Sequence, residues 1–186
     1  RCLQRHKVPF NALVTLNRRN GDHPGRVYGF LREHGVEHVQ FIPVVEPVRT
    51  PGPCAAPQDD LDQPVSPQSI LPAQLGRFLI GVFDRWVRQD VGRVFVRDFE
   101  EALAAWVGIG SSWCVRAKRC GRALALEHNG DLYSCDHYVD PEHKLGNIRD
   151  TPIRELVRSP RQEQFGRDKE QSLPDQCRRC RCLFAC

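Results

Sequence analysis

The chain contains the stretch Cys114-Val-Arg-Ala-Lys-Arg-Cys120-Gly-Arg-Ala-Leu-Ala-Leu-Glu-His-Asn-Gly-Asp-Leu-Tyr-Ser-Cys135-Asp136. Its cysteines follow the spacing Cys-x5-Cys-x14-Cys, and an aspartate comes directly after the third. Between the second and third cysteines, Asn129-Gly130 separates two short apolar-rich runs, and both turn residues tolerate positive φ, which is typical of a β-hairpin. We expect this hairpin to carry Cys135 back towards Cys114 and Cys120.

A second cysteine group lies near the end of the chain with the spacing Cys177-x2-Cys180-x5-Cys186, so six of the nine cysteines fall into two groups. Structural zinc takes four ligands, usually as two closely spaced pairs, and only Cys177 and Cys180 form such a pair. The wider spacing of the first group favours iron–sulfur ligation, in which thiolates reach a larger cluster from different directions. Disulfides are the third alternative, and spacing alone leaves all three open.

Composition limits the classes of partner. The net charge is only +4, and the arginines near the carboxyl end lie among cysteines rather than along a helix face, so nucleic-acid binding is not expected. No run approaches the roughly 18 apolar residues of a membrane span, so no membrane partner is expected. The odd cysteine count and the cysteine-poor amino-terminal half argue for a reducing compartment, and we expect a cytoplasmic protein. The chain opens on Arg1 and contains no methionine, so we expect an internal or processed segment.

The amino-terminal half has the pattern of an α/β unit. Val8–Leu16 is an apolar, β-branched run typical of a buried strand, and a helix is expected from Pro24 until Gly35 ends it. Val36–Val45 is a second such run, so the order is strand, helix, strand. Such units form parallel sheets with functional residues at the carboxyl ends of the strands, which would place residues 40–46 near an active site.

A long loop and further regular elements follow. Residues 46–72 hold seven of the 14 prolines and read as a loop, in which Cys54 is interpreted as an incidental thiol. Residues 73–91 have helical spacing, and their aromatic stripe is interpreted as core. The expected elements after it are a strand over 93–97, a helix over 99–107, a hinge over 108–112, a short connector over 145–148, a helix over 152–157 capped by Thr151, and a polar, weakly helical segment over 160–169.

Four motifs carry a resemblance to a known family: Gln40-Phe-Ile-Pro-Val-Val-Glu46, Phe83-Asp-Arg-Trp-Val-Arg-Gln-Asp-Val-Gly92, Glu127-His-Asn-Gly-Asp-Leu-Tyr-Ser-Cys-Asp-His137 and Leu145-Gly-Asn-Ile148. In this order they resemble the anaerobic sulfatase-maturating enzymes, which are radical S-adenosylmethionine proteins with a SPASM domain. The resemblance implies an α/β fold. Residues 1–107 would be the second half of a partial (β/α)6 barrel, and residues 108–186 would be a small cysteine-rich α+β SPASM domain that continues beyond Cys186.

The resemblance also implies site residues. Cys114, Cys120 and Cys135 would be ligands of a first auxiliary [4Fe-4S] cluster, and one further cysteine outside the chain would complete it. Cys177, Cys180 and Cys186 would bind a second cluster in the same way, whereas Cys182 falls where the family has no ligand. Asp136 would be the catalytic base, although by itself it also suits a cap at the hairpin end. Val39 and Gln40 would contact S-adenosylmethionine. Three histidines could bind zinc but are interpreted as solvated or hydrogen-bonded: His128, His137 and His143.

The activity that the resemblance implies is oxidation of a cysteine or serine of a sulfatase to formylglycine by means of a 5′-deoxyadenosyl radical. The substrate would be an unfolded sulfatase polypeptide, and a flavodoxin or ferredoxin would be the electron donor. The Cys-x3-Cys-x2-Cys motif of the radical cluster is absent from these residues, so the chain alone is expected to be inactive. Two alternatives stay open: a SPASM-type radical enzyme that modifies a ribosomal peptide, and a zinc-binding interaction module.

Overall fold

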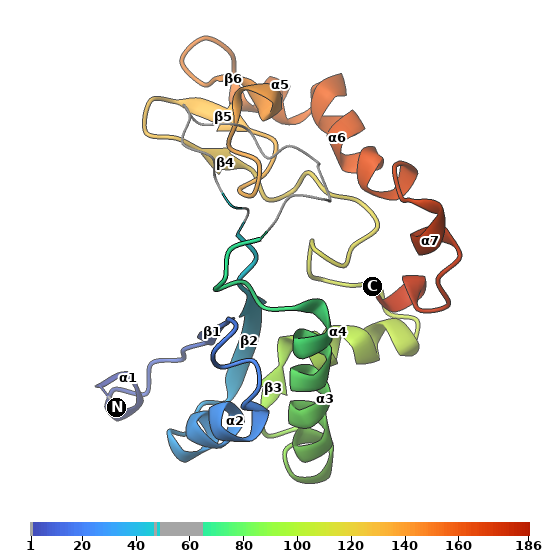
Figure 1. Ribbon diagram of the computed structural model, residues 1–186. Helices are drawn as coiled ribbons and strands as arrows, with labels where there is room; N and C mark the ends of the chain where they lie inside the picture. Colours follow the sequence, from blue (N-terminus) through green and yellow to red (C-terminus); the bar gives the residue numbers. More distant parts are fainter. Residues whose placement is uncertain (1, 47, 49–64) are drawn as a thin grey trace. The chain divides into compact units, whose positions relative to one another are not determined.

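The computed structural model describes residues 2–46, 48 and 65–186, which form two compact units (Figure 1). The first unit is Arg1–Glu100 and the second is Glu101–Cys186. Cys54 and most of the proline-rich loop lie outside the described residues. Along the chain, the division between the two units falls within the helix α4, Arg97–Trp106. The domain boundary predicted between residues 107 and 108 stays a prediction.

A parallel sheet of three strands forms the first unit, which opens with the short helix α1, Cys2–Arg5. The strands β1 (Ala12–Leu16), β2 (His38–Pro43) and β3 (Phe95–Val96) lie in that order, with Leu13 opposite Gln40. The helix α2, Pro24–Glu33, joins β1 to β2, and Gly35 at φ 62° reverses the chain after it. The predicted strand–helix–strand order is therefore confirmed.

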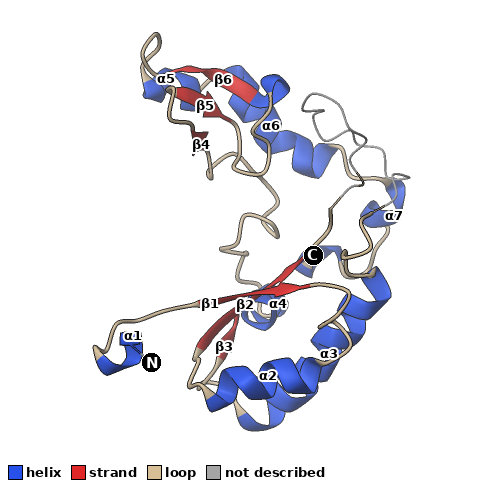
Figure 2. Ribbon diagram, turned by 60° about the vertical axis from the view of Figure 1, so that its left-hand side comes forward, coloured by secondary structure: helices blue, strands red, loops and turns tan. Residues whose placement is uncertain are grey.

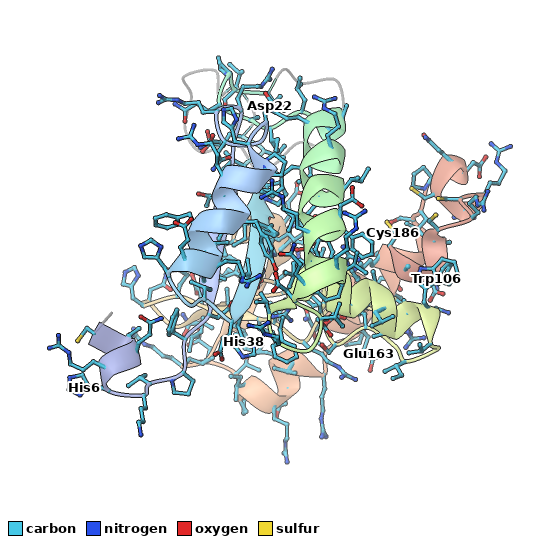
Figure 3. The ribbon with its side chains drawn as sticks, turned by 90° about the horizontal axis from the view of Figure 1, so that it is seen from below. His6, Asp22, His38, Trp106, Glu163 and Cys186 are labelled. Carbon is cyan, nitrogen blue, oxygen red and sulfur yellow. The ribbon has the colours of Figure 1, made fainter. Side chains whose placement is uncertain are left out.

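Two helices cover one face of this sheet. The helix α3, Pro72–Gln89, lies beside α2, and both lie on the same side of the strands (Figures 2 and 3). The predicted aromatic stripe of α3 is core only in part, because Phe83 is 42% exposed. Leu13 is 62% exposed on the opposite face of the sheet. The core of the unit includes these buried side chains: Leu16, Val39, Phe41, Phe78, Val82, Trp86 and Val96.

A buried polar group ties α2 to the end of α3. The Tyr28 hydroxyl donates to Asp90 Oδ2 at 2.8 Å, and the Arg32 guanidinium pairs with the same carboxylate. Only 1% of the Asp90 side chain is exposed. Burial raises the pKa of Tyr28 above its ordinary value, and the hydrogen bond to Asp90 acts in the same direction. The native state therefore holds the Tyr28 proton more tightly than the unfolded chain does.

This proton gives an expected pH dependence of stability. Below pH of about 10 both states keep the Tyr28 proton, whereas above it only the unfolded chain releases it, so native stability falls as pH rises. One proton contributes a slope of about 1.4 kcal/mol per pH unit. We expect Tyr28→Phe to cost about 1 kcal/mol near pH 7 and to remove that slope. Urea unfolding of the parent protein and the variant between pH 8 and about 11.5 measures how the free energy of unfolding depends on pH. If that free energy falls equally with pH in both proteins, Tyr28 is not the group responsible.

The second unit contains an antiparallel sheet of β4 (Ala125–Leu126), β5 (Asp131–Tyr133) and β6 (Lys144–Asn147). The predicted hairpin is confirmed as β4–β5, but of its two turn residues only Gly130 takes positive φ, at 91°. The connector predicted over residues 145–148 is wrong. This segment is largely β6, which pairs with β5 in register Asp131 to Asn147.

Short helices complete the second unit: the 3-10 turns η1 (Pro141–His143) and η2 (Leu183–Ala185) and the helices α5 (Ile153–Val157), α6 (Pro160–Gln171) and α7 (Asp175–Arg178). The Thr151 cap is wrong, because Pro152 occupies the N-cap of α5. Ser159 caps α6 by accepting from the Gln162 amide, and the segment predicted as weakly helical is a regular helix. Among the described helices, none is long and apolar enough to cross a membrane.

Candidate metal centre

Cys135 lies two residues after the end of β5 in the second unit. Cys135 is 9% exposed, and backbone hydrogen bonds of the residues before and after it hold it in place. The Ser134 amide donates to the His143 carbonyl at 2.9 Å, and the Asp136 amide donates to the Ala123 carbonyl at 3.2 Å. Backbone hydrogen bonds to segments outside the β4–β5 hairpin therefore fix the position of Cys135.

Cys120 lies against α6 and close to Cys135. Its amide donates to the Gly166 carbonyl at 3.2 Å. Burial raises the pKa of the Cys135 thiol, and the Asp136 carboxylate and the Cys120 thiol act in the same direction, whereas the backbone of His137 opposes them. These neighbours favour the neutral thiol in the metal-free protein. A bound cation would reverse that preference, because metals bind the thiolate.

The loop that carries Cys114 is held by side chains of two helices, Lys169 of α6 and Glu101 of α4. Lys169 on α6 donates from Nζ to the Cys114 and Val115 carbonyls at 2.5 and 2.6 Å. On the other side of the loop, the buried Glu101 accepts from Ser111 Oγ at 2.5 Å. It also accepts from the Ser112 amide at 3.1 Å and from Ser112 Oγ at 2.6 Å.

The protonation state of Glu101 follows from these bonds. Burial by itself raises the pKa of this carboxyl, but the hydrogen bonds from Ser111 and Ser112 together outweigh it and hold the pKa below its ordinary value. Glu101 is therefore a charged acceptor that anchors the start of the cysteine-bearing loop.

The second cysteine group lies at the carboxyl end of the unit. Cys177 is in α7, and Cys186 follows η2, which Arg116 contacts by donating to the Ala185 carbonyl at 3.3 Å. The Cys182 amide lies 3.4 Å from Cys180 Sγ. A hollow of about 340 Å³ adjoins Cys186 and is lined mainly by these residues: Arg116, Lys118, Lys169, Leu173 and Phe184.

The structure brings Cys120 and Cys135 together but does not assemble all six predicted ligands. Within residues 2–46, 48 and 65–186, no three His, Cys, Asp or Glu side chains are grouped closely enough to hold a metal ion. The eight described cysteines form no disulfide, so the disulfide alternative has no support among them. Free thiols on loops and helix ends are the donor type that iron–sulfur clusters require, so the residues fit such a group by chemistry.

The other predicted site residues fall on different surfaces. Asp136 is exposed, and its Oδ1 lies 3.3 Å from Cys135 Sγ. In the first unit, Val39 is 2% exposed and its side chain lies in the core, so that side chain is not available to a ligand. Gln40 is half-buried and, as the next residue along the strand, points to the opposite face of the sheet.

The surroundings of the three histidines agree with the interpretation that they are solvated or hydrogen-bonded. His143 Nδ1 lies 2.8 Å from Asp140 Oδ1, and its ring packs near Tyr138 and Phe165. His128 and His137 are exposed. None of the three belongs to a metal-binding group among the described residues.

Sequence reasoning missed three residues that hold the cysteine loops: Glu101, Lys169 and Gln162. Each acts on residues between 10 and 55 positions away along the chain, through Ser111, Gly121 or Cys114. Local patterns do not contain such information. The one available signal is that Gln162 occurs in a segment with few apolar residues, whose packing had to depend on polar contacts.

Comparisons with known proteins find relatives over nearly the whole chain. Residues 114–181 match the SPASM family, an iron–sulfur cluster-binding domain. The serine-type anaerobic sulfatase-maturating enzyme of Bacteroides thetaiotaomicron is 41% identical over 187 residues, which cover 99% of this chain and 45% of that enzyme. The cysteine-type enzyme of Clostridium novyi is 29% identical over 161 residues, and this match covers 86% of this chain and 40% of that enzyme. The chain therefore spans less than half the length of these relatives.

Solved structures show the same similarity in three dimensions. The structure of His6-tagged anSMEcpe with bound AdoMet has a TM-score of 0.83 and 25% identity, and the match covers 99% of this chain and 46% of that chain. Native anSMEcpe with bound AdoMet and Cp18Cys peptide gives a TM-score of 0.81 at the same identity, with 48% of that chain covered. The mixed α/β fold with a SPASM domain is thus shared with these proteins.

Proposed function

Because the chain corresponds over 99% of its length to part of the anaerobic sulfatase-maturating enzymes, we propose that its parent protein oxidises a cysteine or serine of a sulfatase to formylglycine. The observation that carries the proposal is the 41% identity to a serine-type enzyme over nearly the whole chain. The relatives include serine-type and cysteine-type enzymes, so the proposal covers both substrates. None of these relatives is named as a ribosomal-peptide enzyme, so that alternative has no comparable support.

The first unit suits half of a partial (β/α)6 barrel. Its strands are parallel, its helices cover one face, and its other face carries Leu13 and Gln40. We propose residues 1–107 as that half and residues 108–186 as the cluster-binding domain, which contains the matched range 114–181. Gln40 would contact S-adenosylmethionine through its side chain. Val39 would do so through its backbone, because its side chain is in the core.

The second unit would hold two auxiliary [4Fe-4S] clusters. We propose Cys114, Cys120 and Cys135 for the first, and the other three for the second: Cys177, Cys180 and Cys186. When bound, the cofactors would supply a radical that removes a hydrogen atom from the substrate Cβ and a route for the electron that then leaves.

Asp136 is proposed as the group that takes the accompanying proton. After the hydrogen atom and one electron have left the substrate, loss of the hydroxyl or thiol proton gives an aldehyde or a thioaldehyde, and hydrolysis of the latter gives formylglycine. The exposure of this carboxylate and its position next to Cys135 support the proposal, because a general base must be reachable by the substrate. The substrate would bind as an extended peptide, and a flavodoxin or ferredoxin would supply the reducing electron.

The direct test uses the full-length protein under anaerobic conditions with S-adenosylmethionine, a reductant and two unfolded sulfatase peptides that differ only in cysteine or serine at the target position. Mass spectrometry is expected to show the aldehyde product from at least one peptide. Replacement of the target residue by alanine is the matched control and should give none. Cleavage of S-adenosylmethionine with no peptide product would reject the sulfatase proposal.

The zinc-module alternative is separated by metal analysis. Iron with acid-labile sulfide in the anaerobically purified protein supports the cluster assignment. Zinc without sulfide would overturn it, because zinc sites contain no inorganic sulfide.

A further inference from the structure

One side chain of α6 joins the two backbone segments that carry Cys120 and Cys135. Gln162 is only 3% exposed, and its Nε2 donates to the Gly121 carbonyl at 3.0 Å and to the Ser134 carbonyl at 3.1 Å. Gly121 directly follows Cys120, and Ser134 directly precedes Cys135. Both amide hydrogens of a single side chain are thus used to bridge the neighbours of two cysteines that lie 15 positions apart.

One turn further along α6, a glycine completes the contact. The Gly166 carbonyl accepts from the Cys120 amide at 3.2 Å. A Cβ atom at Gly166 would lie 2.9 Å from the Cys120 carbonyl oxygen, so a larger residue would push the helix and the loop apart. Gly121 itself has φ 93°, a conformation that turns its carbonyl towards Gln162 at little cost because glycine lacks a Cβ atom.

Polar contacts of this kind hold α6 in place, and Lys169 adds to them by donating to the Cys114 and Val115 carbonyls. Phe165 is the only large apolar side chain in the sequence of α6, so burial of apolar surface contributes little to holding the helix in place. Loss of the Gln162 donors would leave two carbonyls unpaired next to the cysteines, and buried unpaired carbonyls are unfavourable. The loops would then move to recover partners, and the cysteines would move with them.

We propose that Gln162 is a positioning residue that sets the spacing between Cys120 and Cys135 for metal binding. The metal-binding part of this inference rests on the proposed cluster function, whereas the geometric part holds for the metal-free protein as well. Hydrogen bonds that orient metal ligands commonly change metal affinity by about 10- to 100-fold when they are removed. Gln162 touches no predicted ligand side chain and acts through the backbone beside two of them.

The test compares Gln162→Glu with Gln164→Glu in the full-length protein. Both substitutions change one glutamine of α6 to glutamate, but Gln164 is exposed, and its hydrogen bonds to described residues stay within α6, to Asp168 and from Arg167. We expect a chelator to remove iron from the cluster proposed at Cys135 at least about 10-fold faster in Gln162→Glu than in the parent protein. In Gln164→Glu, the rate of iron removal should be unchanged. The electron paramagnetic resonance spectrum of the reduced cluster should shift in the first variant only.

A metal-free measurement separates this inference from the proposed function. In the iron-free protein, we expect hydrogen exchange of the Cys120 amide to be at least about 10-fold faster in Gln162→Glu than in the control. Gln162→Met, which keeps the length but lacks donors and charge, should behave like Gln162→Glu and serves if the charged variant does not fold. Faster exchange in a protein that binds zinc without sulfide would support the positioning role and reject the cluster. Equal exchange and equal metal release in all variants would overturn the positioning role.

Discussion

Asp136→Asn in the full-length enzyme is expected to lower formylglycine formation by about 10²- to 10⁴-fold, the usual contribution of a positioned general base. The asparagine keeps the size of the side chain but cannot take up the substrate proton. Since Asp136 is exposed and follows rather than forms the buried part of the hairpin, its substitution should leave the fold and the iron content unchanged. Peptide turnover by mass spectrometry, with iron and sulfide analysis of the same sample, measures both effects.

Asp150→Asn is the matched control for this prediction. Asp150 is an exposed aspartate of the same unit that follows β6, and no role in proton transfer is assigned to it. Its substitution should leave turnover within about twofold of the parent enzyme, because surface changes rarely matter. If Asp136→Asn turns over peptide as fast as Asp150→Asn does, Asp136 is not the base and the proton goes to another group.

Cys135→Ala is expected to remove one whole cluster, about four iron and four sulfide per chain, because a [4Fe-4S] cluster is held by four thiolates. Cys135 is the most buried of the described cysteines, and alanine leaves only a small void in its place. Iron and sulfide analysis of the anaerobically purified full-length protein provides the measurement. A circular dichroism spectrum checks that the hairpin still forms.

Cys182→Ala is the control for the cysteine assignment. Cys182 lies between Cys180 and Cys186 and is exposed, yet it has no predicted ligand role. Its substitution should retain all the iron. Loss of iron in Cys182→Ala would make Cys182 a ligand of the second cluster, and full retention of iron in Cys135→Ala would remove Cys135 from the ligands of the first.

Elements with strong local signals could be predicted from the sequence. Pro24 and Gly35 mark the limits of α2 closely, and the apolar runs beside them are β1 and β2. Asn129-Gly130 marks the β4–β5 hairpin for the same reason, since a glycine at positive φ is a local requirement. The stripe of α3 was predicted as core throughout, but helical periodicity does not say how wide a face the neighbouring elements cover, and Phe83 remains half exposed.

Features that depend on distant partners could not be predicted in this way. The β6 strand has only four residues with Gly146 among them, and it is stabilised by its pairing with β5 rather than by its own propensity. The candidate site shows the same limit. Spacing identified the cysteine groups, and the resemblance supplied the roles of Asp136 and Gln40. The contacts of Glu101 and Gln162 with loops far along the chain were visible only in the structure.

The buried group formed by Tyr28, Arg32 and Asp90 also has an evolutionary consequence. A single substitution at Asp90 leaves a phenol and a guanidinium without their shared acceptor, while a single substitution at Tyr28 or Arg32 leaves the acceptor under-satisfied. Intermediates on any path that replaces the group one residue at a time are therefore less stable than either end. Among related sequences, these three positions should change as a set, and a lineage that has exchanged them for apolar residues should have exchanged all three.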